Sequence, residues 1–309
     1  MTMLLVIVGP TAVGKSQVAL QVAGKLGGEI VSADSVQVYR GLDIGAGKPS
    51  REERALVPHH LLDIADPRDN YTVADFQRDA QEAINGIQTR NRLPLLVGGT
   101  GLYVRALLQG FAFSASGENQ VLRQKLSEEA KRLGMAVLHH RLTEVDPEAA
   151  ERIHPHDLRR VIRALEVYSQ SQVPISGQRR CTSGTSDYDV RMFILDMPRE
   201  LLYRRIEQRV EKMLAEGLVE EVKGLLSGGV SLQAKSLQSL GYRQIVAYLQ
   251  GEETLARAVE RIKRDTRHYA KRQLTWFRRE PEATWLDISE KGGTAGVAEK
   301  ICAILAGDS

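Results

Sequence analysis

The sequence has few cysteines and no long apolar run, and its net charge is small. Two cysteines, Cys181 and Cys302, are too few for a disulfide framework or a zinc site, which favours a reducing compartment. The apolar run Leu4–Val8 is too short to span a bilayer and follows no basic segment, so we expect a soluble, cytoplasmic protein. A net charge of +3 does not by itself indicate a nucleic-acid partner, although the basic residues are unevenly distributed.

Length and composition are ordinary for a globular protein. The 309 residues suffice for one large domain with an insertion or for two smaller domains, and 42% hydrophobic residues allow a sizeable core. Strand-like and helix-like segments alternate over the first hundred residues, which predicts a largely parallel sheet. From about 115 to 188 the pattern is helical and polar, and the strand-like run 190–197 returns the chain to the sheet. Helices are expected over roughly 199–280, before a last strand in ATWLDIS and a terminal helix.

Residues 9–16, GPTAVGKS, match the phosphate-binding pattern G-x-x-x-x-G-K-[ST] and lie between a predicted strand, 3–8, and a helix that begins near Lys15. In this pattern backbone N–H groups and a helix N-terminus surround a phosphate, the lysine adds a cation, and the Ser16 hydroxyl can join a Mg²⁺ shell. The residues expected to hold the phosphate are Gly9, Pro10, Thr11, Ala12, Val13, Gly14, Lys15 and Ser16.

The fold predicted from these segments is α/β. It consists of a P-loop NTPase-like parallel sheet flanked by helices, with a helical insertion domain. We expect the core to comprise residues 1–114 and 189–309, and the insertion to comprise residues 115–188.

The strand that should carry an acidic metal ligand in an ATPase or GTPase carries none. The apolar run LPLLVGG ends instead in Gly98-Gly99-Thr100-Gly101, a turn without a carboxylate. The loop therefore predicts a bound di- or triphosphate, and the missing acid argues against nucleotide hydrolysis.

Asp34 lies where the second predicted strand ends, so its carboxylate can face the phosphate loop across the sheet edge. There it is expected to act as a general base or to bind Mg²⁺ through water, unless it only caps a turn. Gln37, Tyr39 and Lys48 follow in the same stretch and are either substrate contacts or ordinary loop residues.

Two segments gather basic residues at helical spacing. In RIHPHDLRRVIRALEVY, residues 152–168, three arginines lie opposite an apolar stripe and suit either phosphates or solvent. They are Arg159, Arg160 and Arg163. The segment 261–279 has eight Lys or Arg against one Asp, and it suits either a nucleic-acid backbone or solvent.

The amphipathic segment 199–214 places Arg205 and Arg209 one helical turn apart, just after a predicted strand. Either guanidinium can reach a diphosphate in the phosphate loop, or both can be surface arginines. The sequence leaves this choice open.

Seven segments, in this order, resemble the bacterial type of the tRNA dimethylallyltransferase family, also called tRNA isopentenyltransferases. They are GPTAVGKS, SADSVQVYRGLDIGAGKP, PHHLLDI, LLVGGTGLY, RIHPHDLRRVIRALEV, LGYRQ and AKRQLTWFR, and they extend over almost the whole chain. The first motif is shared with many other proteins, whereas the ordered set is specific. The resemblance implies transfer of a five-carbon prenyl group from dimethylallyl diphosphate to N6 of the adenine at tRNA position 37, with Mg²⁺ required and pyrophosphate released.

Under this resemblance the phosphate loop holds the diphosphate of a prenyl donor, which explains the missing acid. The loop residues 14–16 and Mg²⁺ are expected to neutralise the departing pyrophosphate, and Arg209 to add a second cation. Asp34 is expected to accept a proton from the adenine amine as that amine attacks the allylic carbon. Thr100 is expected to orient the adenine or the diphosphate.

The adenine must leave its stack to reach this site, so the insertion and the 261–279 helix are expected to clamp the anticodon stem-loop of tRNA. The segment FAFSASGENQVLRQ departs from the family's Pro-Ala-Asp pattern, which leaves a contact at Arg123 open. A monomer without membrane contact is expected. The residues expected to contact tRNA are Asp34, Ser35, Val36, Gln37, Thr100, Arg123, Arg159, Arg160, Val161, Ile162, Arg163, Gln238, Gly241, Tyr242, Arg243, Lys271, Arg272 and Arg278.

Three other functions share part of this pattern. A small-molecule kinase would use the same loop with ATP but would leave the basic helices without a role. A prenyltransferase acting on free AMP would not need the arginine-rich insertion. A non-catalytic RNA-binding module would leave Asp34 unexplained.

Overall fold

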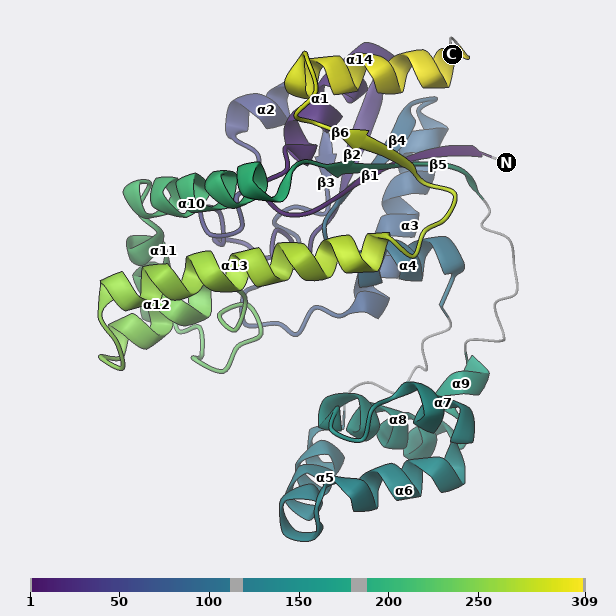
Figure 1. Ribbon diagram of the computed structural model, residues 1–309, viewed down its shortest axis with the longest axis vertical. Coiled ribbons are helices and arrows are strands. Elements are labelled where there is room, and N and C mark those ends of the chain that lie inside the picture. Colours follow the sequence, from purple (N-terminus) through teal and green to yellow (C-terminus); the bar gives the residue numbers. More distant parts are fainter. Residues whose placement is uncertain (1, 112–118, 179–187, 308–309) are drawn as a thin grey trace. The chain divides into compact units, whose positions relative to one another are not determined.

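The computed structural model describes residues 2–111, 119–178 and 188–307 (Figure 1). The chain divides into two compact units, Met1–Leu108 with Ser186–Ser309, and Gln109–Thr185. Cys181 lies outside the described residues, and Cys302 is a free, half-buried thiol. None of the described helices combines the length and the apolarity needed to cross a bilayer.

The first unit is built on a six-stranded sheet in the order β3-β2-β4-β1-β5-β6, in which every paired strand is parallel to its neighbour. This confirms the prediction of an α/β fold with a parallel sheet flanked by helices. The strands are β1 (Thr2–Val8), β2 (Gly28–Ala33), β3 (His59–His60), β4 (Leu93–Gly98), β5 (Tyr188–Asp196) and β6 (Thr284–Asp287).

Helices cover both faces of this sheet (Figure 1), and the central strand β1 is accordingly apolar from Met3 to Val8. In β1, Leu4 and Val6 pack into one hydrophobic core, and Leu5 and Ile7 into the other. The helices of this unit are α1 (Lys15–Leu26), α2 (Arg51–Leu56), α3 (Val73–Thr89), α4 (Gly101–Gln109), α10 (Arg199–Ala215), α11 (Leu218–Ser227), α12 (Tyr242–Leu249), α13 (Leu255–Phe277) and α14 (Gly293–Ala306).

Local chemistry explains several element boundaries. Helix α1 begins at Lys15, as expected, and α3 follows Thr72, whose side chain and that of Asp75 form a reciprocal capping box. Strand β5 covers 188–196 instead of the expected 190–197. The short elements α2 and β3 were not predicted, because neither a six-residue helix nor a two-residue strand contains enough residues to display a period.

The second unit is helical and has a hydrophobic core of its own. Asp157 caps the start of the amphipathic helix α8 (Leu158–Ser171) at the amide of Arg160, and the apolar stripe of that helix, including Val161 and Leu165, is buried. The helices of this unit are α5 (Gln120–Leu133), α6 (Met135–Val145), α7 (Pro147–Arg152), α8 (Leu158–Ser171) and α9 (Ile175–Gln178).

Candidate active site

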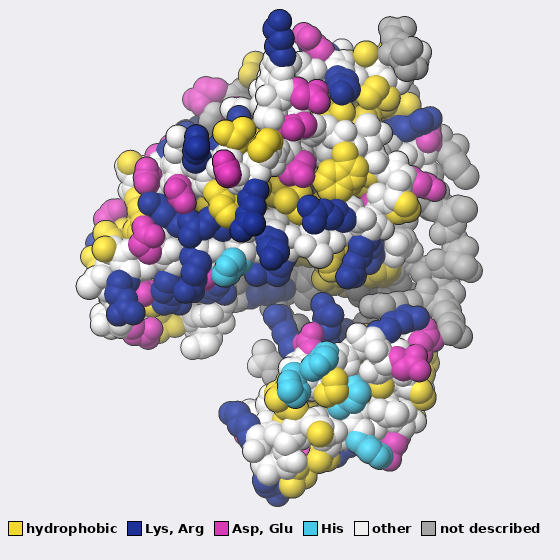
Figure 2. Space-filling model, viewed as in Figure 1, with side chains coloured by type: hydrophobic (Ala, Val, Ile, Leu, Met, Phe, Trp, Pro, Cys, Tyr) yellow, Lys and Arg dark blue, Asp and Glu magenta, His cyan; other side chains and the backbone are white. Residues whose placement is uncertain are grey.

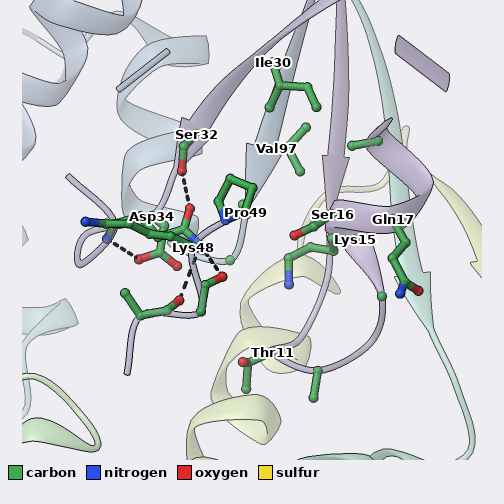
Figure 3. Close-up of a pocket in the computed structure, with 18 of the residues that line it drawn as sticks. Thr11, Lys15, Ser16, Gln17, Ile30, Ser32, Asp34, Lys48, Pro49 and Val97 are labelled. Carbon is green, nitrogen blue, oxygen red and sulfur yellow. Dashed lines mark hydrogen bonds between the residues drawn. The ribbon is translucent and has the colours of Figure 1, made fainter. Parts of the chain in front are cut away.

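The phosphate loop joins β1 to α1 and lines a cavity of about 530 Å³ at the carboxyl edge of the sheet (Figure 3). Ala12 and Gly14 adopt left-handed backbone conformations, with φ of 65° and 111°, which turn the chain before the helix begins. No side chain caps α1, so the amides of its first turn remain available to an anion. Thr11, Ala12, Gly14, Lys15 and Ser16 line the cavity, whereas Gly9, Pro10 and Val13 do not.

Lys15 brings a titratable cation to the cavity. Its Nζ donates a hydrogen bond to the carbonyl of Pro10 at 2.8 Å, within the same loop. Burial of the ammonium and, to a smaller extent, the nearby Arg209 charge lower the pKa of Lys15 to about 7, against the opposing effect of Asp34. A bound polyanion would favour the charged form, so the lysine is suited to respond to a phosphate ligand.

Both candidate arginines of α10 line the cavity. Arg205 Nη1 donates to the carbonyl of Val13 at 3.1 Å, and Arg209 Nη2 approaches the carbonyl of Ala46 at 3.4 Å. Burial lowers the pKa of Arg209 from its ordinary value, while Asp34 raises it. The structure therefore brings two guanidinium groups to the phosphate loop, where the sequence had left the choice between them open.

Asp34 follows directly after β2, and its side chain lies across the cavity from Lys15 and Ser16 (Figure 3). Its Oδ1 accepts hydrogen bonds from the amides of Val36 at 2.8 Å and Gln37 at 3.3 Å. One oxygen thus caps a turn, as the simpler interpretation expected. Among the described residues none donates a hydrogen bond to Oδ2, so this oxygen remains available to a substrate.

Thr100 supports the Asp34 turn from the neighbouring strand. Its amide donates to the carbonyl of Ala33 at 3.2 Å, and its Oγ1 accepts a hydrogen bond from the amide of Ser35 at 3.2 Å. Thr100 does not line the cavity, although Gly98 and Gly99 do. In this structure Thr100 therefore holds the ends of β2 and β4 together behind the cavity.

The polar loop after Asp34 is tied to the opposite wall of the cavity. The Oε1 of Gln37 accepts a hydrogen bond from Ser32, and its Nε2 donates to the carbonyls of Ala46 and Gly47. The Lys48 side chain is almost fully buried, and its Nζ donates to the carbonyl of Tyr39 and to the carboxylates of Asp43 and Asp63. Gln37 and Lys48 therefore shape the cavity, and only Gln37 keeps a half-exposed side chain there.

Two residues that sequence reasoning did not single out hold this site together. Gln273 of α13 is buried, accepts from the amide of Thr11 at 2.9 Å, and donates to the carbonyl of Gly99 at 2.9 Å. Glu221 of α11 accepts hydrogen bonds from three successive amides of the loop that forms the opposite wall. Gln273 lies within AKRQLTWFR. The sequence could have pointed to it only as an uncharged polar residue within a basic helix.

The arginines expected at tRNA in the helical unit, Arg123 of α5 and three arginines of α8, fall into two groups. The carboxylate of Glu166 is fully buried, and Arg123 and Arg163 both donate to it, at 2.8 Å and 2.6 Å. These arginines neutralise a buried acid. Arg159 and Arg160 are exposed, and Arg160 makes only a surface pair with Asp157. Val161 and Ile162 are buried in the helical core, so their side chains do not face solvent here, and a tRNA contact at these two positions stays a prediction.

The residues expected at tRNA on α12 and α13 also differ in exposure. Gly241 and Tyr242 are buried, and a tRNA contact at either residue stays a prediction. Arg243 pairs with Asp265 at 3.2 Å, and the exposed Gln238 donates to the carbonyl of Leu232. Of the residues expected at tRNA in this region, Lys271, Arg272 and Arg278 are exposed and make no ion pair with a described residue.

Basic side chains crowd the surface over α10 and α13 (Figure 2). Part of this charge is balanced: Arg267 pairs with Glu207, and Lys263 with Glu211. In the described part of the chain, no group of three or more His, Cys, Asp or Glu side chains is arranged to hold a metal ion by itself. Four cationic residues line the cavity, Lys15, Lys48, Arg205 and Arg209, against two acidic ones, Asp34 and Glu53, so its lining suits a polyanion.

Known proteins are similar to this chain in sequence and in structure. The family model described as IPP transferase matches residues 37–280, and the model described as isopentenyl transferase matches residues 2–64. The chain is 50% identical to a tRNA dimethylallyltransferase of Desulforudis audaxviator over 298 residues, 96% of each chain. It is 52% identical to tRNA dimethylallyltransferase 2 of Geotalea uraniireducens over 293 residues, 94% of each chain.

Solved structures agree. The full-length tRNA isopentenylpyrophosphate transferase of Bacillus halodurans is 42% identical, with a TM-score of 0.73 over 100% of this chain and 98% of that one. A eukaryotic dimethylallyltransferase acting on tRNA is 29% identical, with a TM-score of 0.84 over 100% of this chain and 79% of that one. The phosphate loop, the two arginines and the ordered motifs therefore have one common explanation: the chain belongs to the IPP transferase family, the family of the tRNA dimethylallyltransferases.

Proposed function

We propose that this protein transfers a dimethylallyl group from dimethylallyl diphosphate to N6 of the adenine at position 37 of tRNA, releasing pyrophosphate. One observation carries the proposal beyond family membership. A single cavity contains the phosphate loop, two arginines and Asp34, while the strand end at Gly98 lacks the acid that nucleotide hydrolysis requires. Such a cavity suits a diphosphate that leaves intact.

In the proposed reaction the N6–C1 bond forms as the C1–O bond to the diphosphate breaks. The bonding electrons leave with the diphosphate oxygen, where negative charge accumulates. Lys15, Arg205 and Arg209 line the cavity at that position, and the free amides of α1 add positive potential. These groups stabilise the leaving group more than the bound donor, and so they lower the barrier.

The adenine amine needs a base, because its lone pair is delocalised into the ring. In our proposal the Oδ2 of Asp34 accepts the N6 proton as the new bond forms. Two amides fix Oδ1 and thereby the direction of the carboxylate. Thr100 supports this turn through Ser35, which is the role we now propose for Thr100 in place of a direct contact.

The residues present fit a magnesium ion that is held mainly by the diphosphate. Ser16 is exposed at the cavity, and its hydroxyl makes no hydrogen bond with a described residue. It offers one hard oxygen donor, while diphosphate oxygens and water would supply the remainder. When bound, the ion would neutralise charge on the leaving pyrophosphate.

We propose that tRNA is held by the exposed basic residues that other side chains do not neutralise. Arg159 of α8 and Lys271, Arg272 and Arg278 of α13 and its C-cap meet this description. Arg160 is also exposed and stays a predicted contact, although it pairs with Asp157 at the surface. The anticodon stem-loop is the proposed partner, with the adenine flipped into the cavity. Ser35, Val36, Gln37, Gln238 and Arg243 stay predicted contacts, whereas Arg123 and Arg163 are proposed to support the helical unit. A cytoplasmic location and a monomeric state also stay predictions.

The test supplies dimethylallyl diphosphate or ATP, each with and without unmodified tRNA. We expect pyrophosphate release only from the prenyl donor and only with tRNA, together with N6-prenylated adenosine in the nuclease digest of that tRNA. Replacing tRNA by AMP should give no product. Phosphate transfer from ATP would instead support a kinase, and prenylation of AMP would support a nucleotide-specific enzyme.

A further inference from the structure

The loop of residues 43–48 forms a wall of the active-site cavity, which Ala46, Gly47 and Lys48 line. From inside, Gln37 and Arg209 both approach the loop's backbone carbonyls. Two backbone hydrogen bonds, Gly47 to Ile44 and Lys48 to Asp43, close the loop into a turn. Its centre, residues 45–47, has no large side chain to anchor it, so its position also depends on what holds it from behind.

Glu221 of α11 holds three consecutive amides of this loop. Its Oε2 accepts from Asp43 at 2.9 Å and from Ile44 at 2.7 Å, and its Oε1 accepts from Gly45 at 3.1 Å. Hydrogen bonds to a charged acceptor are stronger than neutral ones. One carboxylate therefore fixes the backbone of half the loop, although Glu221 does not line the catalytic cavity.

Tyr242 of α12 extends the same contact by one residue. Its hydroxyl donates to Glu221 Oε1 at 2.6 Å and accepts from the amide of Ala46 at 3.1 Å. The side chain is fully buried, and burial beside Glu221 raises the pKa of Tyr242 well above its ordinary range, so the hydroxyl remains a donor. A Cβ on Gly45 would lie 2.5 Å from the tyrosine ring, so only glycine permits this approach.

Loop 43–48 in turn contacts Arg209, which lines the cavity beside the phosphate loop. Arg209 Nη2 lies 3.4 Å from the carbonyl of Ala46, and a Cβ on Gly47 would lie 2.0 Å from the same atom. The guanidinium thus rests against the loop backbone. A displacement of residues 45–47 would move Arg209, because closely packed groups transmit such shifts.

We infer that Glu221 and Tyr242 are positioning residues that place Arg209 for the departing diphosphate. The inference rests on the proposed function, since it assumes that the cavity binds this ligand. It assigns a new role to the tyrosine of the LGYRQ motif. This tyrosine holds the loop that contacts Arg209 and does not contact tRNA.

The test uses Tyr242→Phe and Glu221→Gln in the full chain, with inorganic pyrophosphate and Mg²⁺ as the probe and calorimetry as the readout. Tyr242→Phe keeps the ring and removes the hydroxyl, and Glu221→Gln turns part of the acceptor into a donor facing amides. Because each leaves buried groups unpaired, we expect pyrophosphate affinity to fall about tenfold in each variant. Affinity for tRNA should stay within about twofold of wild type.

Matched controls lie beside each position. Glu220→Gln makes the same change one residue away on α11, where the side chain is exposed and pairs only with Lys223. Tyr248→Phe removes a hydroxyl on the same helix as Tyr242. Both should bind pyrophosphate as wild type does, and thermal unfolding of all variants verifies that they are folded.

Unchanged pyrophosphate affinity in folded Glu221→Gln and Tyr242→Phe would overturn the inference. An equal loss of tRNA and pyrophosphate affinity would overturn it as well, because that result means a general loosening or a tRNA contact. If wild type binds pyrophosphate but transfers no prenyl group, the proposed function fails while the positioning role is still measured. If Tyr242→Phe does not fold, the pyrophosphate and tRNA affinities of Glu221→Gln test the inference by the same criteria.

Discussion

The side-chain carbonyl of Gln273 accepts a hydrogen bond from the backbone amide of Thr11 at 2.9 Å. This bond joins the long basic helix α13 to the phosphate loop, although the residues lie at opposite ends of the sequence. The amide of the same side chain donates to the carbonyl of Gly99, at the end of β4. One buried glutamine thereby fixes two walls of the cavity relative to each other.

Gln273→Glu should weaken binding of dimethylallyl diphosphate. The substitution keeps the shape and the acceptor for Thr11, but it places a carboxylate oxygen against the carbonyl of Gly99. We expect the KM for the prenyl donor to rise about tenfold or more, since a buried repulsive contact replaces a hydrogen bond. Steady-state kinetics measure this change, and Gln233→Glu, at an exposed loop position, serves as the control. An unchanged KM would contradict the proposed bridging role.

Asp34→Asn should slow the chemical step and leave binding intact. Asparagine keeps the oxygen that accepts from Val36, so the turn remains, but its amide cannot accept the adenine proton. Single-turnover prenylation should be slower by about 10²-fold or more, with tRNA and donor affinities close to wild type. Asp189→Asn, at an exposed carboxylate, is the control. A rate within a few-fold of wild type would remove Asp34 from the mechanism.

Pyrophosphate affinity should fall as the pH rises through the range in which free Lys15 loses its proton. Burial and the Arg209 charge place the pKa of Lys15 at about 7 in the free protein, and a bound anion raises that pKa. Above about pH 7, binding of pyrophosphate is therefore coupled to uptake of a proton by Lys15. Isothermal titrations between about pH 6 and about pH 9, in two buffers of different ionisation enthalpy, measure the uptake.

Lys15→Met is the comparison for this pH series, because it keeps the titration of the ligand and removes that of the lysine. We expect weaker binding throughout and a shallower fall with pH. Identical pH profiles for Lys15→Met and wild type would show that Lys15 does not titrate with binding.

The two groups of arginines on α8 should behave in opposite ways. Arg163→Ala leaves the buried carboxylate of Glu166 with one fewer partner, which should destabilise the protein by about 2 kcal/mol. Arg159→Ala removes an exposed cation and should leave the unfolding temperature unchanged. If Arg159 contacts a phosphate, tRNA affinity falls and the slope of log affinity against log salt decreases by about one. Calorimetric unfolding and filter binding separate the two effects.

Much of the fold follows from patterns that are visible along the chain. The apolar run of β1 predicted a strand buried on both faces, and Thr72 with Asp75 predicted the start of α3. The phosphate loop is equally local, because its eight residues carry their glycines and their lysine in a fixed spacing. Elements without a period, such as β3, could not be found in this way.

The arginines show where pattern reasoning stops. Arg159 and Arg163 lie one helical turn apart and are chemically identical, yet one is exposed and the other pairs with buried Glu166. Helical spacing places Arg163, three residues before Glu166, beside that acid, but the packing of α5 against α8 buries the acid and adds Arg123 as a second partner. The burial of Tyr242 depends in the same way on a distant segment, loop 43–48.

The sequence by itself determined the family, the parallel α/β fold and the loop that binds phosphate, because each depends on residues that are close together or on motifs in a fixed order. The tertiary structure decided which distant side chains complete the cavity. Arg205 and Arg209 reach it from α10, Gln273 braces it from α13, and Glu221 holds its outer wall. These contacts span long stretches of chain, and no local propensity encodes them, so only the packing of the helices on the sheet brings them together.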